Sequence, residues 1–230
     1  ERACLSGDLS AFDASIPPEL IAIAGEVLGN LVEYGPRFVY LLAASMANGV
    51  NLITPTKIWK AQPSSMKSGS GLTNILDCIV NLIVQIYGKL NGQYEIDSQV
   101  VQGDDFVIDG NGVNPESISE AFATFGMEAN PDKQMYQRNA LSYLQRVHLQ
   151  GMLGGIYPVS RVLGSSLSYE RIRYSPKKWS GFVDVVATLS KLENAAFSPW
   201  FPWTVKFLSK GDKYELGRYM DPTHLLKRAG

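Results

Sequence analysis

The sequence has few of the residues that build disulfide frameworks or metal clusters. Its 230 residues include only two cysteines, Cys4 and Cys78. These cysteines show neither a metal-ligand spacing nor a disulfide pattern, so a reducing compartment fits the chain. The N-terminus also lacks the basic head and apolar run of a signal peptide.

Long hydrophobic runs are missing as well. The most apolar stretch, Leu76–Leu90, is too short to span a bilayer and is interrupted by Asp77, Asn81 and Gln85. This pattern excludes an ordinary membrane protein. No internal repeat or low-complexity segment is present. A composition of 45% hydrophobic and 19% charged residues is typical of a soluble globular protein rather than a disordered one.

The chain has no large excess of positive or negative charge, since its formal net charge is -1. The charges are, however, unevenly distributed along the sequence. Residues 1–150 hold 9 Lys and Arg against 16 Asp and Glu, a net charge of -7. Residues 151–230 hold 12 against 6, a net charge of +6. This division suggests a polyanion on the basic side and cations on the acidic side. Uneven surface charge without a ligand is the alternative.

Periodicity and turn residues predict an α+β fold. Pro17 and Pro18 suit the first turn of a helix, whose apolar residues recur at helical spacing as far as Val32. Gln99–Val101 and Phe106–Ile108 flank a four-residue turn, which is typical of a hairpin. The other expected elements are a strand over Arg2–Leu9, helices over Arg37–Ala47, Thr73–Lys89 and Pro115–Phe125, strands within Asn51–Lys60 and Met135–Val147, and helices near Trp179–Leu192 and Trp200–Ser209.

Turns and short strands, and no helix, are expected in two further segments. A turn-rich segment follows the first strand as far as Ser15, and short strands and turns are expected from Gly151 to the late helices. The order of elements predicts an antiparallel sheet backed by helices, followed by a mostly helical module.

The hairpin turn carries the sharpest chemical signal. Asp104 and Asp105 stand side by side at its tip, and Gly103 allows the tight bend. Two adjacent like charges on a stiff turn cost stability unless a positive charge lies there, so the pair favours a metal site. Because Gly-Asp and Asp-Asp are common in turns, an ordinary turn is the alternative.

Asp8 and Asp13 form a second acidic pair. Asp8 is expected at the end of the first strand, with Asp13 one turn further along. With Asp104, Asp8 would supply the strand-end oxygen ligands for two Mg²⁺ ions, which favour carboxylates, substrate phosphates and water. Two such ions about 4 Å apart activate an attacking hydroxyl and stabilise a leaving pyrophosphate.

Small residues open the long helix that precedes the hairpin. The loop Ser68–Gly71 lets a backbone or a nucleotide approach closely. On the helix, Thr73, Asp77, Asn81 and Gln85 recur every four residues and form one polar stripe. A buried stripe would need polar partners, whereas a stripe that faces water is the alternative.

These segments resemble the motifs of viral RNA-dependent RNA polymerases. Asp8–Asp13, Ser68–Thr73 and Gly103–Asp105 are similar to motifs A, B and C, in the family's order. Phe125–Lys133 resembles motif D, and Leu141–Arg146 resembles the motif E strand. Each motif is modest alone, but the ordered triple is specific. The start of motif B and the compact C-terminal module look most like picobirnaviruses and partitiviruses, which have double-stranded RNA genomes.

The resemblance implies a polymerase palm over residues 1–150, with a small fingers-side insertion at about 35–66, and a thumb over residues 151–230. It implies RNA-templated RNA synthesis from NTPs with two Mg²⁺ ions, for which Mn²⁺ could substitute. RNA template, RNA product and NTPs are the implied partners. A viral capsid protein is a further candidate partner, and the host cytoplasm, within the virion or a replication particle, is the expected location.

The resemblance also implies roles for single residues. Asp8 and Asp104 would be the principal metal ligands, with Asp105 in support. Asp13 would accept a hydrogen bond from the 2′-hydroxyl of the incoming ribose, the group that separates RNA from DNA precursors. Lys133 would donate a proton to pyrophosphate.

Further implied roles concern the nucleotide and the RNA. Ser68, Gly69 and Thr73 would help to set nucleotide geometry. Asp77 stands where the family often has Asn, so either Asp77 acts as the acceptor in sugar selection, or Asn74 or Asn81 substitutes. Tyr143–Arg146 would support the primer end. The other thumb cations would contact RNA, or, as the alternative, form a solvent-exposed face without a ligand. The candidate RNA-facing cations are Arg146, Arg161, Arg171, Arg173, Lys177 and Lys178.

The chain is expected to be an N-terminally truncated piece. It opens at Glu1 without an initiator methionine, and a strand with a functional carboxylate begins within the first residues. The basic fingers motif that grips the triphosphate precedes motif A in the family. The chain alone is therefore expected to be inactive or nearly so.

Two alternatives to the RNA polymerase remain. A reverse transcriptase usually has an aromatic residue before the paired aspartates and an aromatic sugar gate after the first catalytic aspartate. Here Gln102 and Gly103 precede the pair, and Ser10 lies two residues after Asp8. A non-catalytic RNA-binding remnant of a polymerase would have no reason to keep mutually repelling carboxylates.

Overall fold

The computed structural model describes residues 3–47, 50–62, 65–129, 131–168, 181–213, 215–217, 219, 221 and 223. Contacts between residues divide the chain into two compact units, Glu1–Leu144 and Gln145–Gly230. The first unit combines helices with antiparallel strands, and the second consists mainly of helices.

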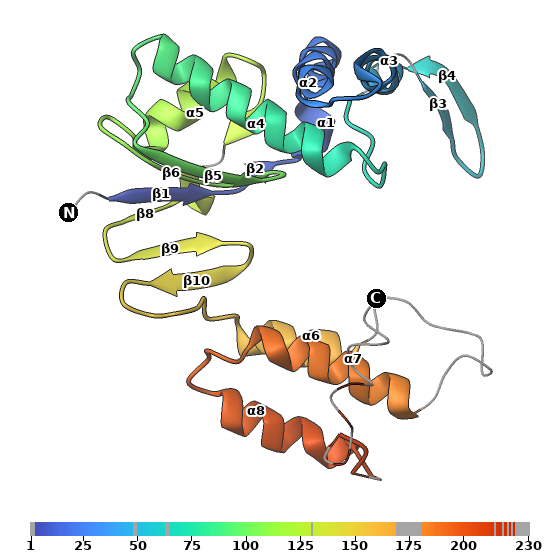
Figure 1. Ribbon diagram of the computed structural model, residues 1–230, viewed down its shortest axis with the longest axis vertical. Coiled ribbons are helices and arrows are strands. Elements are labelled where there is room, and N and C mark those ends of the chain that lie inside the picture. The colour runs from blue at the N-terminus through green and yellow to red at the C-terminus, as the bar shows by residue number, and fades with distance from the viewer. Residues whose placement is uncertain are drawn as a thin grey trace. The chain divides into compact units, whose positions relative to one another are not determined.

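A four-stranded antiparallel sheet forms the centre of the first unit (Figure 1). Gln102 pairs with Asp105 across the turn, so the predicted hairpin is confirmed. On the other side of the second hairpin strand, Gly7 pairs with Phe106. The end of the first strand therefore lies beside the hairpin turn. The strand order is β5 (Ser98–Gln102), β6 (Asp105–Asp109), β1 (Cys4–Gly7) and β8 (Met135–Gln137).

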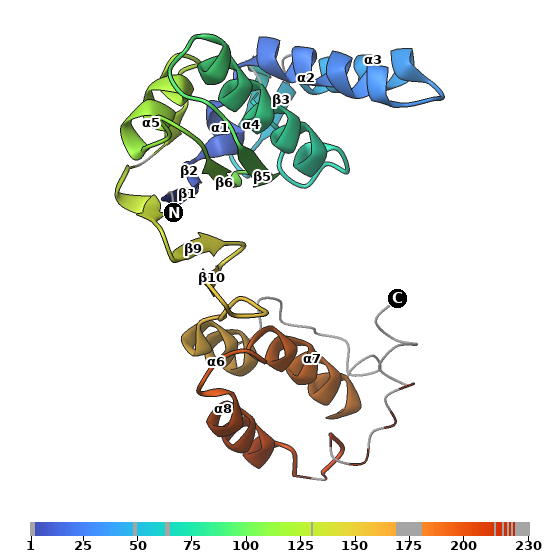
Figure 2. The same cartoon turned by 60° about the vertical axis from the view of Figure 1, so that its left-hand side comes forward.

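Helices cover one face of this sheet in both ribbon views (Figures 1 and 2). The predicted long helix and the helix led by Pro17 and Pro18 are confirmed. The helix after the hairpin begins with a capping box, in which Ser117 N donates to Asn114 Oδ1 at 2.8 Å and Asn114 N donates to Ser117 Oγ at 3.1 Å. The helices are α1 (Phe12–Ser15), α2 (Pro18–Leu31), α3 (Pro36–Ala47), α4 (Thr73–Leu90) and α5 (Pro115–Ala123).

Alternation along β1 separates the two faces of the sheet. Leu5 is fully buried in the helix-side core, where the rings of Phe106 and Phe122 stack 5.9 Å apart. Ser6 points to the other face, and its Oγ accepts a hydrogen bond from Ser142 N at 2.9 Å. The smaller elements are β2 (Leu9–Ser10), paired with β7 (Glu128–Ala129); β3 (Val50–Ile53), paired with β4 (Ile58–Gln62); β9 (Ala140–Tyr143); and the 3-10 turn η1 (Pro131–Lys133).

The second unit has a small core of its own. Val162, Leu192 and Ala195 are its buried apolar residues within the described part of the chain. Its elements are β10 (Arg146–Leu149), α6 (Val159–Leu167), α7 (Gly181–Asn194), α8 (Phe201–Leu208) and the 3-10 turn η3 (Ser209–Gly211).

Two short helices correct the predictions made from the sequence. Helix α6 lies where strands and turns were expected. The helix was not predicted because Ser and Gly between its apolar residues obscure the helical spacing that places Val162 in the core. Helix α1 lies in the segment expected to be turn-rich. Its single turn follows Ala11, whose left-handed backbone (φ 48°) no periodicity can reveal.

Within the described ranges, none of the helices has the length and apolarity needed to cross a membrane. Helix α4, which contains the apolar stretch, has a buried polar stripe instead.

Candidate active site

The turn between β5 and β6 brings the two predicted acidic sites together. Asp8 directly follows β1, whose last residue Gly7 pairs with Phe106, so Asp8 emerges beside Asp105 and Asp104. The carboxyl groups of Asp8 and Asp104 lie within hydrogen-bond range of one another. Gly103 has a φ of 63°, a left-handed conformation that glycine adopts without strain.

This convergence raises the proton affinity of the turn. Burial raises the pKa of the Asp104 carboxyl, as do the nearby carboxyls of Asp8 and Asp13, against a backbone hydrogen bond that lowers it. Burial also raises the pKa of Asp105, followed by the charges of Asp104 and Asp8. Acidic groups in this arrangement gain from a cation placed among them.

Among the described residues, Lys133 brings a positive charge to this cluster. Lys133 Nζ lies 3.7 Å from Asp8 Oδ2. Both side chains are about half exposed, so the pair contributes little to folding stability. Its position matters more, because it places an ammonium group at the edge of the carboxylates.

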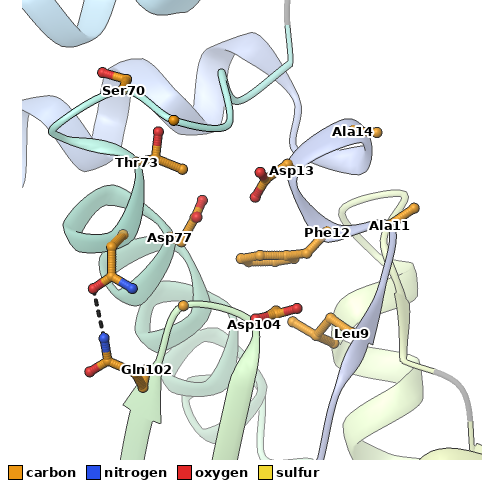
Figure 3. A pocket seen from close by; sticks show the side chains of 13 residues that line it. Leu9, Ala11, Phe12, Asp13, Ala14, Ser70, Thr73, Asp77, Gln102 and Asp104 are labelled. Atoms are coloured by element: carbon orange, nitrogen blue, oxygen red, sulfur yellow. Dashed lines mark hydrogen bonds between the residues drawn. The ribbon is translucent and has the colours of Figure 1, made fainter. Parts of the chain in front are cut away.

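A cavity of about 580 Å³ opens beside Asp104 (Figure 3). It brings together five of the residues selected from the sequence: Asp13, Gly69, Thr73, Asp77 and Asp104. Ser68 and Asn81 are not among its lining residues. Phe12, Ser70 and Gln102 also line the cavity. They lie within segments selected from the sequence but had no predicted role of their own, because no pattern distinguishes them from their neighbours. Asn74, the alternative to Asp77 in sugar selection, lines the cavity as well.

From Asp77 onward the polar stripe of α4 is buried, so the alternative that it faces water is wrong for its last three residues, whereas Thr73 is partly exposed. Asp77 is 5% exposed, and Asn81 and Gln85 are fully buried. Asn81 Nδ2 donates to the Gly103 carbonyl at 3.0 Å, and Gln85 Nε2 donates to Asn81 Oδ1 at 2.7 Å. Asn81 is therefore engaged by the hairpin and not directed into the cavity.

Asp77 and Asp13 face one another in the cavity (Figure 3). Burial raises the pKa of Asp77 to about 7, with further contributions from the charge and the hydrogen bond of Asp13 and from the charge of Asp104. Asp77 Oδ1 is buried and has no hydrogen-bond partner among the residues that the structure describes. The two carboxyls thus form a buried polar contact that is not fully satisfied within the described protein.

The loop before α4 is tied to the same wall. Met66 N donates to the Asp13 carbonyl at 2.8 Å, and Thr73 Oγ1 donates to the Lys67 carbonyl. Gly69 has a φ of 86°, and no atom of the described residues lies within 4 Å of the position that a Cβ would take. The left-handed backbone of the loop, and not crowding, therefore favours glycine there.

Comparison with known proteins identifies the family. A model of the family described as "Viral RNA-dependent RNA polymerase" matches residues 1–162. The chain belongs to the viral RNA-dependent RNA polymerase family.

Individual relatives agree with this assignment. A potential RNA-dependent RNA polymerase of human picobirnavirus is 27% identical over 227 residues, which cover 91% of this chain and 40% of that protein. A genome polyprotein of avian encephalomyelitis virus is 33% identical over 76 residues, which cover 33% of this chain and 4% of the polyprotein.

Solved structures show the same fold. The crystal structure of the RNA-dependent RNA polymerase of a human picobirnavirus has a TM-score of 0.85 at 24% identity, and its insertion loop deletion mutant has a TM-score of 0.84. Each comparison covers 100% of this chain and 46% of the solved one. This polymerase chain thus spans less than half the length of the picobirnavirus relatives that it matches.

The arginines selected in the second unit of the polymerase chain have polar, uncharged partners. Arg146 Nη2 donates to Asn194 Oδ1 at 2.5 Å, and Arg161 Nη1 donates to Gln145 Oε1 at 2.6 Å. These contacts orient the guanidinium groups without neutralising them. Arg171, Arg173, Lys177 and Lys178 lie outside the described residues.

The acidic cluster suits a divalent cation that is shared with a substrate. Among the described residues, no three His, Cys, Asp or Glu side chains are gathered closely enough to hold a metal by themselves. Mg²⁺ does not require such a cage, since it commonly takes one or two carboxylates together with substrate phosphates and water. The contact between Asp8 and Asp104 supplies carboxylate donors of this kind.

Proposed function

We propose that this chain carries the palm and thumb of an enzyme that synthesises RNA on an RNA template from NTPs. The palm corresponds to residues 1–150, with α3, β3 and β4 in its fingers-side insertion, and the thumb to residues 151–230. The observation that carries the proposal is the convergence of Asp8 and Asp104 at one edge of the antiparallel sheet.

In this proposal Asp8 and Asp104 hold two Mg²⁺ ions, with Asp105 in support. When bound, the ions would lower the pKa of the attacking hydroxyl and stabilise the leaving pyrophosphate. The chain's own residues hold the reacting groups in place. Rigid strands and the turn at Gly103 fix the two carboxylates, so their geometry needs little reorganisation during the reaction.

Sugar selection is assigned to the cavity beside Asp104. The ribose 2′-hydroxyl would lie beside Asp13 and Asp77, which face one another there, and the Asp13 carboxylate would accept its hydrogen bond. A deoxyribose would not form this hydrogen bond, and the loss would give selectivity for ribose. Thr73 and the loop at Ser68 and Gly69 would border the base and ribose.

Lys133 is assigned to the leaving group. Its ammonium lies 3.7 Å from Asp8. If Asp8 holds a metal ion that binds the pyrophosphate, Lys133 would be close enough to donate a proton to that group. Tyr143 is assigned to the primer end with Arg146. Burial raises the pKa of the Tyr143 phenol, as do Asp105 and Cys78, which is consistent with a position close to the hairpin.

The expected partners are RNA template, RNA product and NTPs, with a capsid protein as a further candidate within a virion or replication particle in the host cytoplasm. The thumb would contact RNA phosphates through Arg146, Arg161, Arg171 and Arg173.

The test is a single carboxylate change in the polymerase expressed at its native length. Asp104→Asn should abolish primer extension and leave RNA binding within about twofold, because phosphate contacts by cations supply most of the affinity. Asp109→Asn is the matched control, since it makes the same change at the far end of β6. Undiminished synthesis by Asp104→Asn would refute the proposal.

A further inference from the structure

The hairpin tip is held by one helix at three places. Gln102 Nε2 donates to Asn74 Oδ1 at 2.8 Å, Gly103 N donates to Cys78 Sγ at 3.1 Å, and Asn81 Nδ2 donates to the Gly103 carbonyl at 3.0 Å. We name Asn74, Cys78 and Asn81 the hairpin clamp. These residues are four and three positions apart, so they share one face of α4.

The clamp acts on the peptide groups next to Asp104. The Gly103 N–H belongs to the peptide that enters the glycine, and its carbonyl belongs to the peptide that leads into Asp104. Both are bonded to α4, by Cys78 and Asn81. Glycine is the most conformationally free residue, and Gly103 stands at a φ of 63°, so these bonds select one orientation among several that it could adopt.

The clamp is itself supported from below. Gln85 Nε2 donates to Asn81 Oδ1 at 2.7 Å, and the Tyr94 hydroxyl donates to the backbone carbonyl of Gln85 at 2.9 Å. Asn81 and Gln85 are fully buried, and Tyr94 is 3% exposed. The two bonds of the Asn81 amide fix its direction, because a flipped amide would set its oxygen against the Gly103 carbonyl and its NH₂ group against Gln85 Nε2.

The same helix also lines the cavity. Thr73 and Asp77 face the cavity, one position before Asn74 and Cys78 respectively. The neighbouring faces of one rigid helix therefore hold the catalytic hairpin and the candidate nucleotide site in fixed register.

We propose that Cys78 and Asn81 are positioning residues for catalysis, which act by holding the Gly103 peptide so that the Asp104 carboxylate stays in its reactive place. The proposal rests on the proposed function, since it concerns the rate of RNA synthesis. Such residues should change turnover more than substrate affinity, because a misplacement of about 1 Å at the reacting centre costs up to about 100-fold in rate.

The test compares variants in the native-length polymerase by NTP-dependent primer extension, with kcat expressed per folded molecule from thermal melting. Cys78→Ala removes the acceptor for Gly103 N, and we expect kcat to fall about tenfold while KM for NTP stays within about twofold. Cys78→Ser restores an acceptor, and its kcat should return to within about threefold of the unchanged enzyme. Lys89→Ala, at the other end of α4, is the matched control and should leave kcat unchanged.

A second variant covers the case in which Cys78→Ala does not fold. Asn81→Asp keeps the side-chain size but sets an oxygen against the Gly103 carbonyl, so kcat should fall about 100-fold with little change in KM. Three results would overturn the proposed role of the clamp. The first is a normal kcat in the Cys78→Ala or Asn81→Asp variant, and the second is a Cys78→Ser variant that is no faster than Cys78→Ala. The third is a loss that affects only KM. An inactive unchanged enzyme would instead overturn the proposed function.

Discussion

At the scale of single residues, the cavity is defined by a carboxyl that is both buried and partly unpaired. Asp77 stands where the viral RNA-dependent RNA polymerase family often has Asn, and the residue spacing alone does not explain how a carboxyl is tolerated there. The structure supplies the reason: Asp77 shares a hydrogen bond with Asp13, and burial favours its protonated form. Proximity to Asp13 depends on the left-handed turn at Ala11, which the sequence does not reveal.

This arrangement predicts a pH-dependent stability. The pKa of Asp77 is raised from an ordinary 3.8 to about 7, so between these values the folded protein binds more protons than the unfolded one. Folding stability from this group therefore falls as pH rises through that window. The free energy of unfolding of Asp77→Asn, minus that of the unchanged protein, should therefore be about 2 kcal/mol larger at about pH 8 than at about pH 5. This figure is lower than the full pKa shift would give, because water in the cavity screens the carboxyl.

Urea denaturation without divalent cations at the two pH values measures this difference. An equal effect of Asp77→Asn at both would show that Asp77 ionises as an ordinary carboxyl. Because Asn is the residue that the family often has at this place, we also expect the variant to retain RNA synthesis.

Lys133 gives a second prediction at this scale. Lys133→Met should change stability by less than about 0.5 kcal/mol, since the pair with Asp8 is about half exposed. It should lower kcat by about 10²–10⁴, the usual contribution of a general acid. Lys133→Arg keeps the charge but cannot release its proton, so it should also remain slow.

Lys89→Met is the matched control, because Lys89 is another partly exposed lysine in an ion pair, 3.5 Å from Glu95. A Lys133→Arg enzyme with normal turnover would show that charge alone, without proton transfer, is required.

At the scale of elements, the long and regular pieces could be predicted from the sequence. The expected Thr73–Lys89 helix is observed as Thr73–Leu90, and the strands on either side of the acidic turn pair as expected. Their patterns are set by local periodicity. The hairpin clamp could not be predicted in the same way, because a cysteine or asparagine on a helix face does not indicate which backbone group it will meet.

The element that supports the hairpin strand provides the third prediction. Phe122 of α5 is fully buried and stacks on Phe106, which follows Asp105. Phe122→Ala should therefore destabilise the protein by about 3–5 kcal/mol. Phe38→Ala is the control, since Phe38 is 69% exposed and its loss should cost less than about 0.5 kcal/mol. Equal melting temperatures for the two variants would contradict this account of the core.

At the scale of the whole molecule, the division of charge along the chain is a property of sequence alone. Residues 151–230 carry a net charge of +6, and residues 1–150 a net charge of -7. The acidic part contains the converging carboxylates, whose placement requires strands far apart in the chain. Sequence order and motif resemblance predicted that placement. In the basic part, α7 and α8 lie close to the helices that the sequence predicted, whereas α6 was not predicted.

The basic part yields the fourth prediction. If Arg161 contacts a phosphate, Arg161→Ala should weaken RNA binding for all sequences alike. The slope of log K against log salt concentration should also become shallower by about 1, because about one fewer counterion is released on binding. Lys89→Ala serves as the control and should leave this slope unchanged. An unchanged slope for Arg161→Ala would favour the alternative that this arginine belongs to a solvated face.

The central claim is that the carboxylates of Asp8 and Asp104 together hold divalent cations with the substrate. The most direct test is Mn²⁺ binding, measured by electron paramagnetic resonance in the presence of NTP, for the unchanged native-length polymerase and for Asp8→Asn, Asp104→Asn and the Asp109→Asn control. We predict that Asp8→Asn and Asp104→Asn each weaken Mn²⁺ binding by at least about tenfold and that the control does not. Unchanged Mn²⁺ binding in both variants would contradict the account.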